Sequence, residues 1–102
     1  MVGDTSKSTN SFGEALRAIR LGKNLSMQDV YTKATGRTYY SALELGKKNP
    51  TLTKVDEIAN ALDIHPLALL LLNYAQTSDE SMLHLIAQAK VDLEALGLWT
   101  EG

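Results

Sequence analysis

The sequence has no cysteine, only two histidines and no long apolar run. Without thiols there is no disulfide and no thiolate chemistry, and such a composition favours the reducing cytosol. The longest apolar run, Leu67 to Leu72, is much shorter than the about 20 residues that a membrane-spanning helix needs. The polar start of the chain also lacks the apolar stretch of a secretion signal. We therefore expect a cytoplasmic protein with no membrane partner.

Features that would indicate an enzyme are missing as well. His65 and His84 are 19 residues apart, and neither has a cluster of further metal-ligating residues around it. The sequence has no glycine-rich phosphate loop and no nucleophile placed beside a base. Carboxylate pairs such as Asp56 and Glu57 fall on the solvated side of a helical pattern. We expect no catalysis, no metal or other cofactor, and, since no second domain would form a pocket, no small-molecule ligand.

Charge is divided unevenly along the chain. Residues 1–54 hold nine Lys and Arg against four Asp and Glu, a net charge of +5. Residues 55–102 hold one basic residue against eight acidic ones, a net charge of −7. Halves of opposite sign indicate that one half faces a polyanion and the other turns away from it. Chance clustering on a solvated surface would give the same numbers, so charge alone leaves both interpretations open.

Apolar spacing and capping residues predict helices only, because no stretch alternates with the period of two that a strand requires. Two capping boxes, Ser11 with Glu14 and Ser26 with Asp29, open the first two helices, and Gly46 is placed to end the third. The predicted helices are residues 11–22, 27–34, 37–45, 52–62, 66–74 and roughly 79–96. The residues expected in the core are Phe12, Ala15, Leu16, Ile19, Val30, Tyr40, Leu43, Val55, Ile58, Ala59 and Leu62.

The last two predicted helices carry more apolar residues than one core-facing side needs. In helix 66–74, Leu67, Leu70 and Leu71 can face inward, which leaves Leu69 and Leu72 on other sides. Helix 79–96, preceded by a capping signal at Thr77 and Glu80, has apolar residues at alternating spacings of four and three, the pattern of paired helices. The expected dimer interface is Leu69, Leu72, Met82, Leu85, Ile86, Ala89, Leu93 and Leu96. The alternative is that the last helix folds back over its own chain.

Two short helices joined by a tight turn, with basic residues beside the second, form the pattern of a helix-turn-helix. Residues 12–70, about 60% of the chain, resemble the Cro/cI-type (XRE) helix-turn-helix domain. The resemblance rests on FGEALRAIR at 12–20, LS at 25–26, SALELGKKNP at 41–50 and IANAL at 58–62. Its most specific part is the spacing of Ser41, Glu44, Gly46 and Pro50, which follow two amphipathic helices in the sequence.

The resemblance implies an all-α fold, a five-helix lambda-repressor-like DNA-binding bundle, followed here by a C-terminal helix. The chain then divides into a flexible arm at 1–10, a DNA-binding domain at 11–74 and a C-terminal helix at 75–102, which we expect to be the dimerisation element. The implied function is a nucleoid-associated transcription regulator that binds double-stranded DNA at a palindromic operator as a homodimer. The alternative is an antitoxin-type DNA-binding protein that also binds a partner toxin through its C-terminal half.

The resemblance also assigns residues to the contact with DNA. The recognition helix, residues 37–45, enters the major groove with its first turn deepest. The positions that match base-reading residues are Arg37, Thr38, Ser41 and Ala42, and the Arg37 guanidinium can bond both O6 and N7 of guanine. Phosphate contacts are expected from Ser26, Gln28, Tyr39, Lys47 and Lys48. Arg20 and Glu44 match a structural pair between the first and third helices, and Tyr40 matches a core position.

Overall fold

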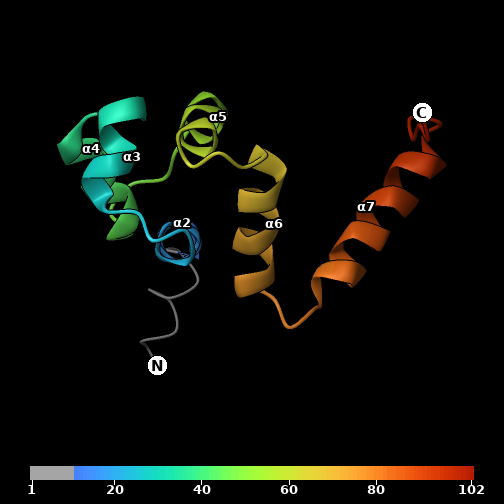
Figure 1. The fold of residues 1–102 in the computed structure, drawn as a ribbon. Coiled ribbons are helices and arrows are strands. Elements are labelled where there is room, and N and C mark those ends of the chain that lie inside the picture. The colour runs from blue at the N-terminus through green and yellow to red at the C-terminus, as the bar shows by residue number, and fades with distance from the viewer. Residues whose placement is uncertain (1–10) are drawn as a thin grey trace.

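The computed structural model describes residues 11–102, and every regular element in this range is a helix. The helices are α2 (Ser11–Gly22), α3 (Met27–Ala34), α4 (Arg37–Glu44), α5 (Leu52–Ala61), α6 (Pro66–Gln76) and α7 (Met82–Ala95). Helices α2 to α6 form a bundle, and α7 extends away from it after the end of α6 (Figure 1). The fold is thus the expected all-α bundle with a C-terminal helix, while the arm expected at 1–10 lies outside the described residues.

Local hydrogen bonds determine where the helices begin. In the predicted capping box of α3, Ser26 Oγ accepts from the backbone N–H of Asp29 at 3.0 Å, and the Asp29 carboxylate accepts from the backbone N–H of Ser26 at 2.8 Å. The hydrogen bond from the Ser26 backbone lowers the pKa of Asp29 below its ordinary value. Thr51 caps α5 by accepting from the N–H of Lys54. The side chain of Ser11, from the other predicted capping box, lies outside the described part of the chain.

The helix-turn-helix itself has a very short connection. Only Thr35 and Gly36 separate α3 from α4, so the two helices pack directly against each other. At the other end of α4, Gly46 adopts a left-handed backbone (φ +77°) and donates its N–H to the carbonyl of Leu43 at 3.1 Å. A glycine adopts this conformation without steric cost, which explains the sharp end of the helix.

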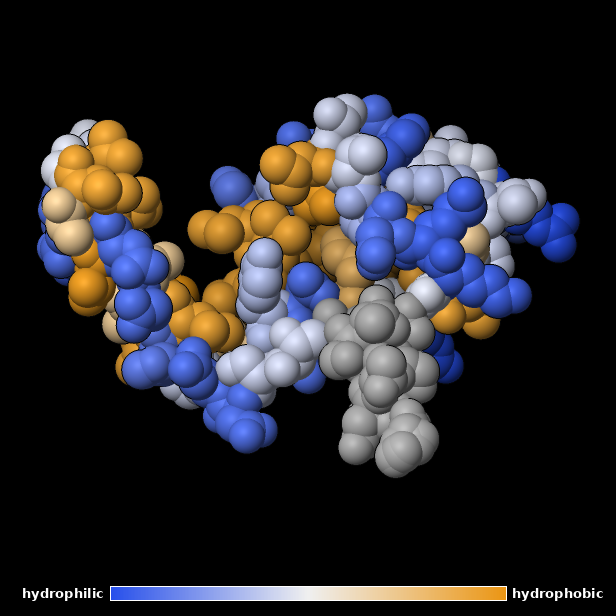
Figure 2. Space-filling view, turned by 180° about the vertical axis from the view of Figure 1, so that it is seen from behind, coloured by the Kyte–Doolittle hydropathy of each residue, from blue (hydrophilic) through white to orange (hydrophobic). Residues whose placement is uncertain are grey.

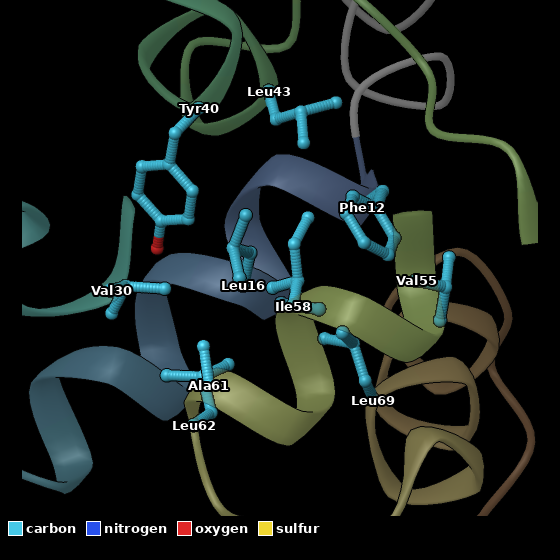
Figure 3. Packing of buried hydrophobic residues seen from close by; sticks show 11 residues of the cluster. Phe12, Leu16, Val30, Tyr40, Leu43, Val55, Ile58, Ala61, Leu62 and Leu69 are labelled. Carbon is cyan, nitrogen blue, oxygen red and sulfur yellow. The ribbon is translucent and has the colours of Figure 1, made fainter. Parts of the chain in front are cut away.

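All helices from α2 through α6 contribute side chains to one apolar core (Figure 3). Its largest fully buried side chains are Tyr40, Leu16, Leu43, Ile58, Leu62, Leu69 and Val30. Every residue that the sequence places in the core is buried except Ile19, which is partly buried and packs against the cluster. Helix α7, described along its whole length, contributes no buried residue. The core is therefore complete without α7.

Two expectations about the C-terminal half are wrong. Leu69 is fully buried within its own chain, so it is not available to a dimer interface, whereas Leu67 is 64% exposed. Helix α6 is apolar on all sides, so spacing does not identify one inner face, and packing against α2 and α5 selects it. The last helix begins at Met82 and not near residue 79, because Ser81 Oγ accepts from the backbone N–H of His84 at 3.1 Å.

Candidate nucleic-acid interface

Helix α4 borders an open hollow on the protein surface, which we call the α4 hollow. Its volume is about 470 Å³, and its lining residues are Arg37, Thr38, Ser41, Ala42, Leu45 and Lys47. The α4 hollow therefore brings together all four expected base-reading residues and one of the expected phosphate contacts. Arg37 and Thr38, in the first turn of α4, are exposed to solvent, and Ser41 and Ala42 in the next turn are half-buried. Leu45 is the lining residue that sequence reasoning missed, although it follows Ser41 at the helical spacing of four.

The other expected phosphate contacts are spread more widely. Ser26 and Gln28 are exposed at the start of α3, and the Ser26 hydroxyl already accepts a hydrogen bond within its capping box. Lys48 is exposed in the loop after α4 but does not line the α4 hollow. Tyr39 is half-buried against the core, and the Lys54 ammonium lies 5.8 Å from the centre of its ring. Tyr39 is thus partly engaged by the core and by Lys54 of α5.

A nearly buried ion pair joins α2 to α4. Arg20 Nε donates to Glu44 Oε2 at 2.6 Å and Nη2 donates to Oε1 at 3.0 Å, which is a bidentate contact. The remaining Nη1 donates to the carbonyl of Leu25, just before α3, at 2.9 Å. The hydrogen bond to the Glu44 carboxylate raises the pKa of Arg20 above its ordinary value, so the guanidinium stays charged. One guanidinium therefore connects α2, the start of α3 and the end of α4.

Tyr40 lies beside this ion pair as a packing residue. Its side chain is fully buried, and its ring centre is 6.5 Å from that of Tyr31. Burial raises the pKa of its hydroxyl above the ordinary value, so the hydroxyl remains protonated. That hydroxyl has no hydrogen-bond partner among the residues that the structure describes. Tyr40 is thus placed in the core, where it cannot reach DNA.

Helix α2 approaches the end of α4 with no side chain between their backbones. A Cβ atom at Gly13 would lie 2.4 Å from the carbonyl oxygen of Leu43 and 2.7 Å from that of Glu44. Only glycine permits this approach, because these distances are far shorter than a van der Waals contact. Gly22, at the end of α2, has open space at the same position. Gly13 and the Arg20–Glu44 pair therefore both lie where α2 packs closely against the C-terminal end of α4.

The residues described by the structure offer neither a metal site nor a membrane span. Within 11–102, no three His, Asp or Glu side chains gather where they could share a metal ion. Over the same range, no helix combines the length and the apolar character needed to cross a bilayer.

Two short helices with a two-residue turn, the second held at its C-terminal end and exposing a polar face, define a helix-turn-helix DNA-binding protein. The helix-turn-helix family matches residues 16–69, and the chain belongs to this family, in its Cro/C1 (XRE) type. The chain is similar to control protein C.BamHI of Bacillus amyloliquefaciens, with 38% identity over 61 residues, 58% of this chain and 75% of that protein. No solved structure gives a significant match. The protein is a DNA-binding transcriptional regulator.

Proposed function

We propose that this regulator binds a palindromic operator as a homodimer, with α4 of each protomer in the major groove. The observation that carries the proposal is the α4 hollow, where Arg37, Thr38, Ser41 and Ala42 share one surface with Lys47. An α-helix fits the major groove, whose base edges distinguish all four base pairs. One such surface reads only a few base pairs, so two half-sites about 34 Å apart are the usual route to useful specificity. The similarity to a protein called a control protein agrees with a regulatory role.

Within this interface, Arg37 and Lys47 have different proposed roles, which mutation can separate. Arg37→Ala should cost roughly 1–3 kcal/mol of binding free energy and relax the preference at one base pair per half-site, because a guanidinium reads a guanine edge. Lys47→Ala should weaken binding to all sequences alike, because phosphates carry no sequence information. Selection of bound sequences from random DNA, followed by titration of matched and mismatched duplexes, measures both effects.

A charge-matched control for this experiment is Lys23→Ala. The Lys23 ammonium donates to the carbonyl of Asp63 at 3.2 Å and does not line the α4 hollow. Its removal should leave the sequence preference unchanged and have the smallest effect on affinity. If Arg37→Ala and Lys47→Ala produced the same uniform loss on every duplex, the division into base-reading and phosphate-binding residues would be wrong.

The C-terminal half exposes an apolar surface suited to pairing two protomers. On α6, Leu67 and Tyr74 are exposed, and on α7 the side chains of Leu83, Ile86 and Leu96 are 78%, 49% and 71% exposed. Figure 2 shows apolar residues on α7 and on the bundle on opposite sides of an open gap. Monomeric soluble proteins rarely expose a large contiguous apolar patch. We propose that a second copy of the chain covers this one.

The pattern of α7 supports pairing with a second copy. Met82, Leu85, Ile86, Ala89, Leu93 and Leu96 form one stripe along the helix, and their spacing is that of paired helices. Helix α7 has 14 residues, too few to be stable alone in water, and it packs mainly against α6 without covering its own stripe. Of the two α6 residues expected at the interface, Leu69 is excluded by burial and Leu72 is half-buried. The net charge of −7 on residues 55–102 also favours an arrangement with this half away from DNA.

Sedimentation at micromolar protein concentration tests the homodimer. We expect the full chain to be dimeric and Ile86→Asp to be monomeric, because the new carboxylate would be buried in the paired stripe. Gln88→Asp introduces the same charge on an exposed residue outside the stripe and should remain dimeric. A chain that ends at Thr77 retains the complete core and should be monomeric.

Two outcomes would contradict this assignment. A monomeric full chain would exclude the homodimer and favour a different protein partner for α7, as in the antitoxin alternative. A dimer that persists after truncation at Thr77 would place the interface within the DNA-binding bundle.

A further inference from the structure

Leu45 is a large apolar side chain that the fold leaves exposed beside polar residues. It is 64% exposed and takes no part in the core. It is the C-cap residue of α4, with a right-handed helical backbone, and its N–H donates to the carbonyl of Ser41 at 3.0 Å. Its position is therefore fixed as a continuation of the recognition helix, and its exposure is not a feature of a loose loop.

Leu45 lies on the same side of α4 as the expected base-reading residues. Arg37, Ser41 and Leu45 follow one another at intervals of four residues, which places them along one face of a helix, and all three line the α4 hollow. At 1.5 Å per residue, Leu45 lies about 12 Å from Arg37 along the helix axis. The two residues therefore lie at opposite ends of the surface that α4 presents in the α4 hollow.

An exposed leucine on this surface contributes most to the free energy of binding when it contacts an apolar group of the DNA. The edges of guanine, cytosine and adenine present only hydrogen-bond donors and acceptors to the major groove, whereas thymine also presents its C5-methyl group. Burying two apolar groups against each other removes both from water. The side chain of Leu45 has no polar atom that could form a hydrogen bond with a phosphate or with another base edge. We propose that Leu45 is a further specificity-determining residue, which contacts the C5-methyl group of a thymine at the end of each half-site opposite to the base pair read by Arg37.

This proposal rests on the proposed insertion of α4 into the major groove, and it is tested by removing the methyl group alone. An operator selected with the full-length protein is resynthesised with deoxyuridine in place of thymidine at one position of each half-site at a time. At one position the exchange should lower the affinity of the unsubstituted protein about four-fold per half-site, the value of one buried methyl group. Leu45→Ala should lower the affinity for the thymine operator by a comparable factor. The deoxyuridine exchange should not lower the affinity of this variant further, because the effects of removing two groups that contact each other do not add.

Leu52→Ala is the matched control, since Leu52 is equally apolar, exposed at the start of α5 and not part of the α4 hollow. The affinity of the Leu52→Ala variant should fall on the deoxyuridine operator by the same factor as that of the unsubstituted protein. If Leu45→Ala kept the full sensitivity to deoxyuridine at every position while Arg37→Ala still relaxed one base pair, the assignment of Leu45 would be overturned and the proposed function would stand. If the unsubstituted protein showed no sequence preference at all, the proposed function would fail and the role of Leu45 with it.

Discussion

Alanine in place of Arg20 or Glu44 is expected to cost about 3–5 kcal/mol of unfolding free energy, because each change leaves a buried charge without its partner. Both side chains are nearly buried, at 9% and 5% exposure, so solvent offers little compensation. In a domain of this size, about 1 kcal/mol corresponds to at least about 4 °C, so the melting temperature should fall by about 12 °C or more. Operator affinity should fall as well, measured at a temperature at which the variants are folded, because the pair holds the end of α4.

The Lys54–Glu57 pair provides the control for this experiment. Its N–O distance is 3.1 Å, but its side chains are 39% and 43% exposed, so water screens the charges. Glu57→Ala should change the unfolding free energy by less than about 1 kcal/mol. Unchanged melting in both the Arg20 and the Glu44 variants would show that these two charges do not stabilise the packing of α2 against α4.

Raising the salt concentration from about 50 to 200 mM should weaken operator binding about 10³-fold. This value assumes six or more phosphate contacts per dimer, each of which releases counterions. The slope of log affinity against log salt concentration is then about −5. The net charge of +5 on residues 1–54 and the exposed lysines after α4 motivate it. Titrations on a specific duplex over this range measure the slope.

The variants of the DNA interface sharpen the salt experiment. Lys47→Ala should make the slope shallower by about one for each phosphate that the lysine no longer neutralises. Leu45→Ala should leave the slope unchanged, because a leucine side chain carries no charge and neutralises no phosphate. A flat salt dependence on a specific site would contradict DNA binding through phosphate contacts from the basic half.

The parts of the fold that the sequence predicts best are those that depend on neighbouring residues. The capping box of Ser26 and Asp29 joins groups three residues apart, so its hydrogen bonds follow from the local chain alone. The inner face of α6 does not follow in this way, because a helix apolar on all sides can bury Leu67 or Leu69, and only packing against α2 and α5 selects Leu69. Helix existence is therefore predictable here, whereas the orientation of a uniformly apolar helix is not.

The candidate site shows the same division between local pattern and tertiary packing. The family resemblance assigned the four base-reading positions, and the structure gathers them in the α4 hollow, although their contact with DNA stays a prediction. Gly13 could not be found from the pattern, because its importance depends on carbonyl groups about 30 residues away. Leu45 could have been found from its spacing, since it follows Arg37 and Ser41 on the same helical face.

Helix α7 contributes nothing to the core, and this has a consequence for how such regulators diversify. Substitutions in α7 leave the packing of α2 to α6 untouched, so they carry little cost in the stability of the DNA-binding bundle. Residues of α4 that face DNA can likewise change without altering α7. If α7 pairs two protomers as proposed, changes in the C-terminal helix alone would let two related regulators coexist in one cell without forming mixed dimers, and each would keep its own operator.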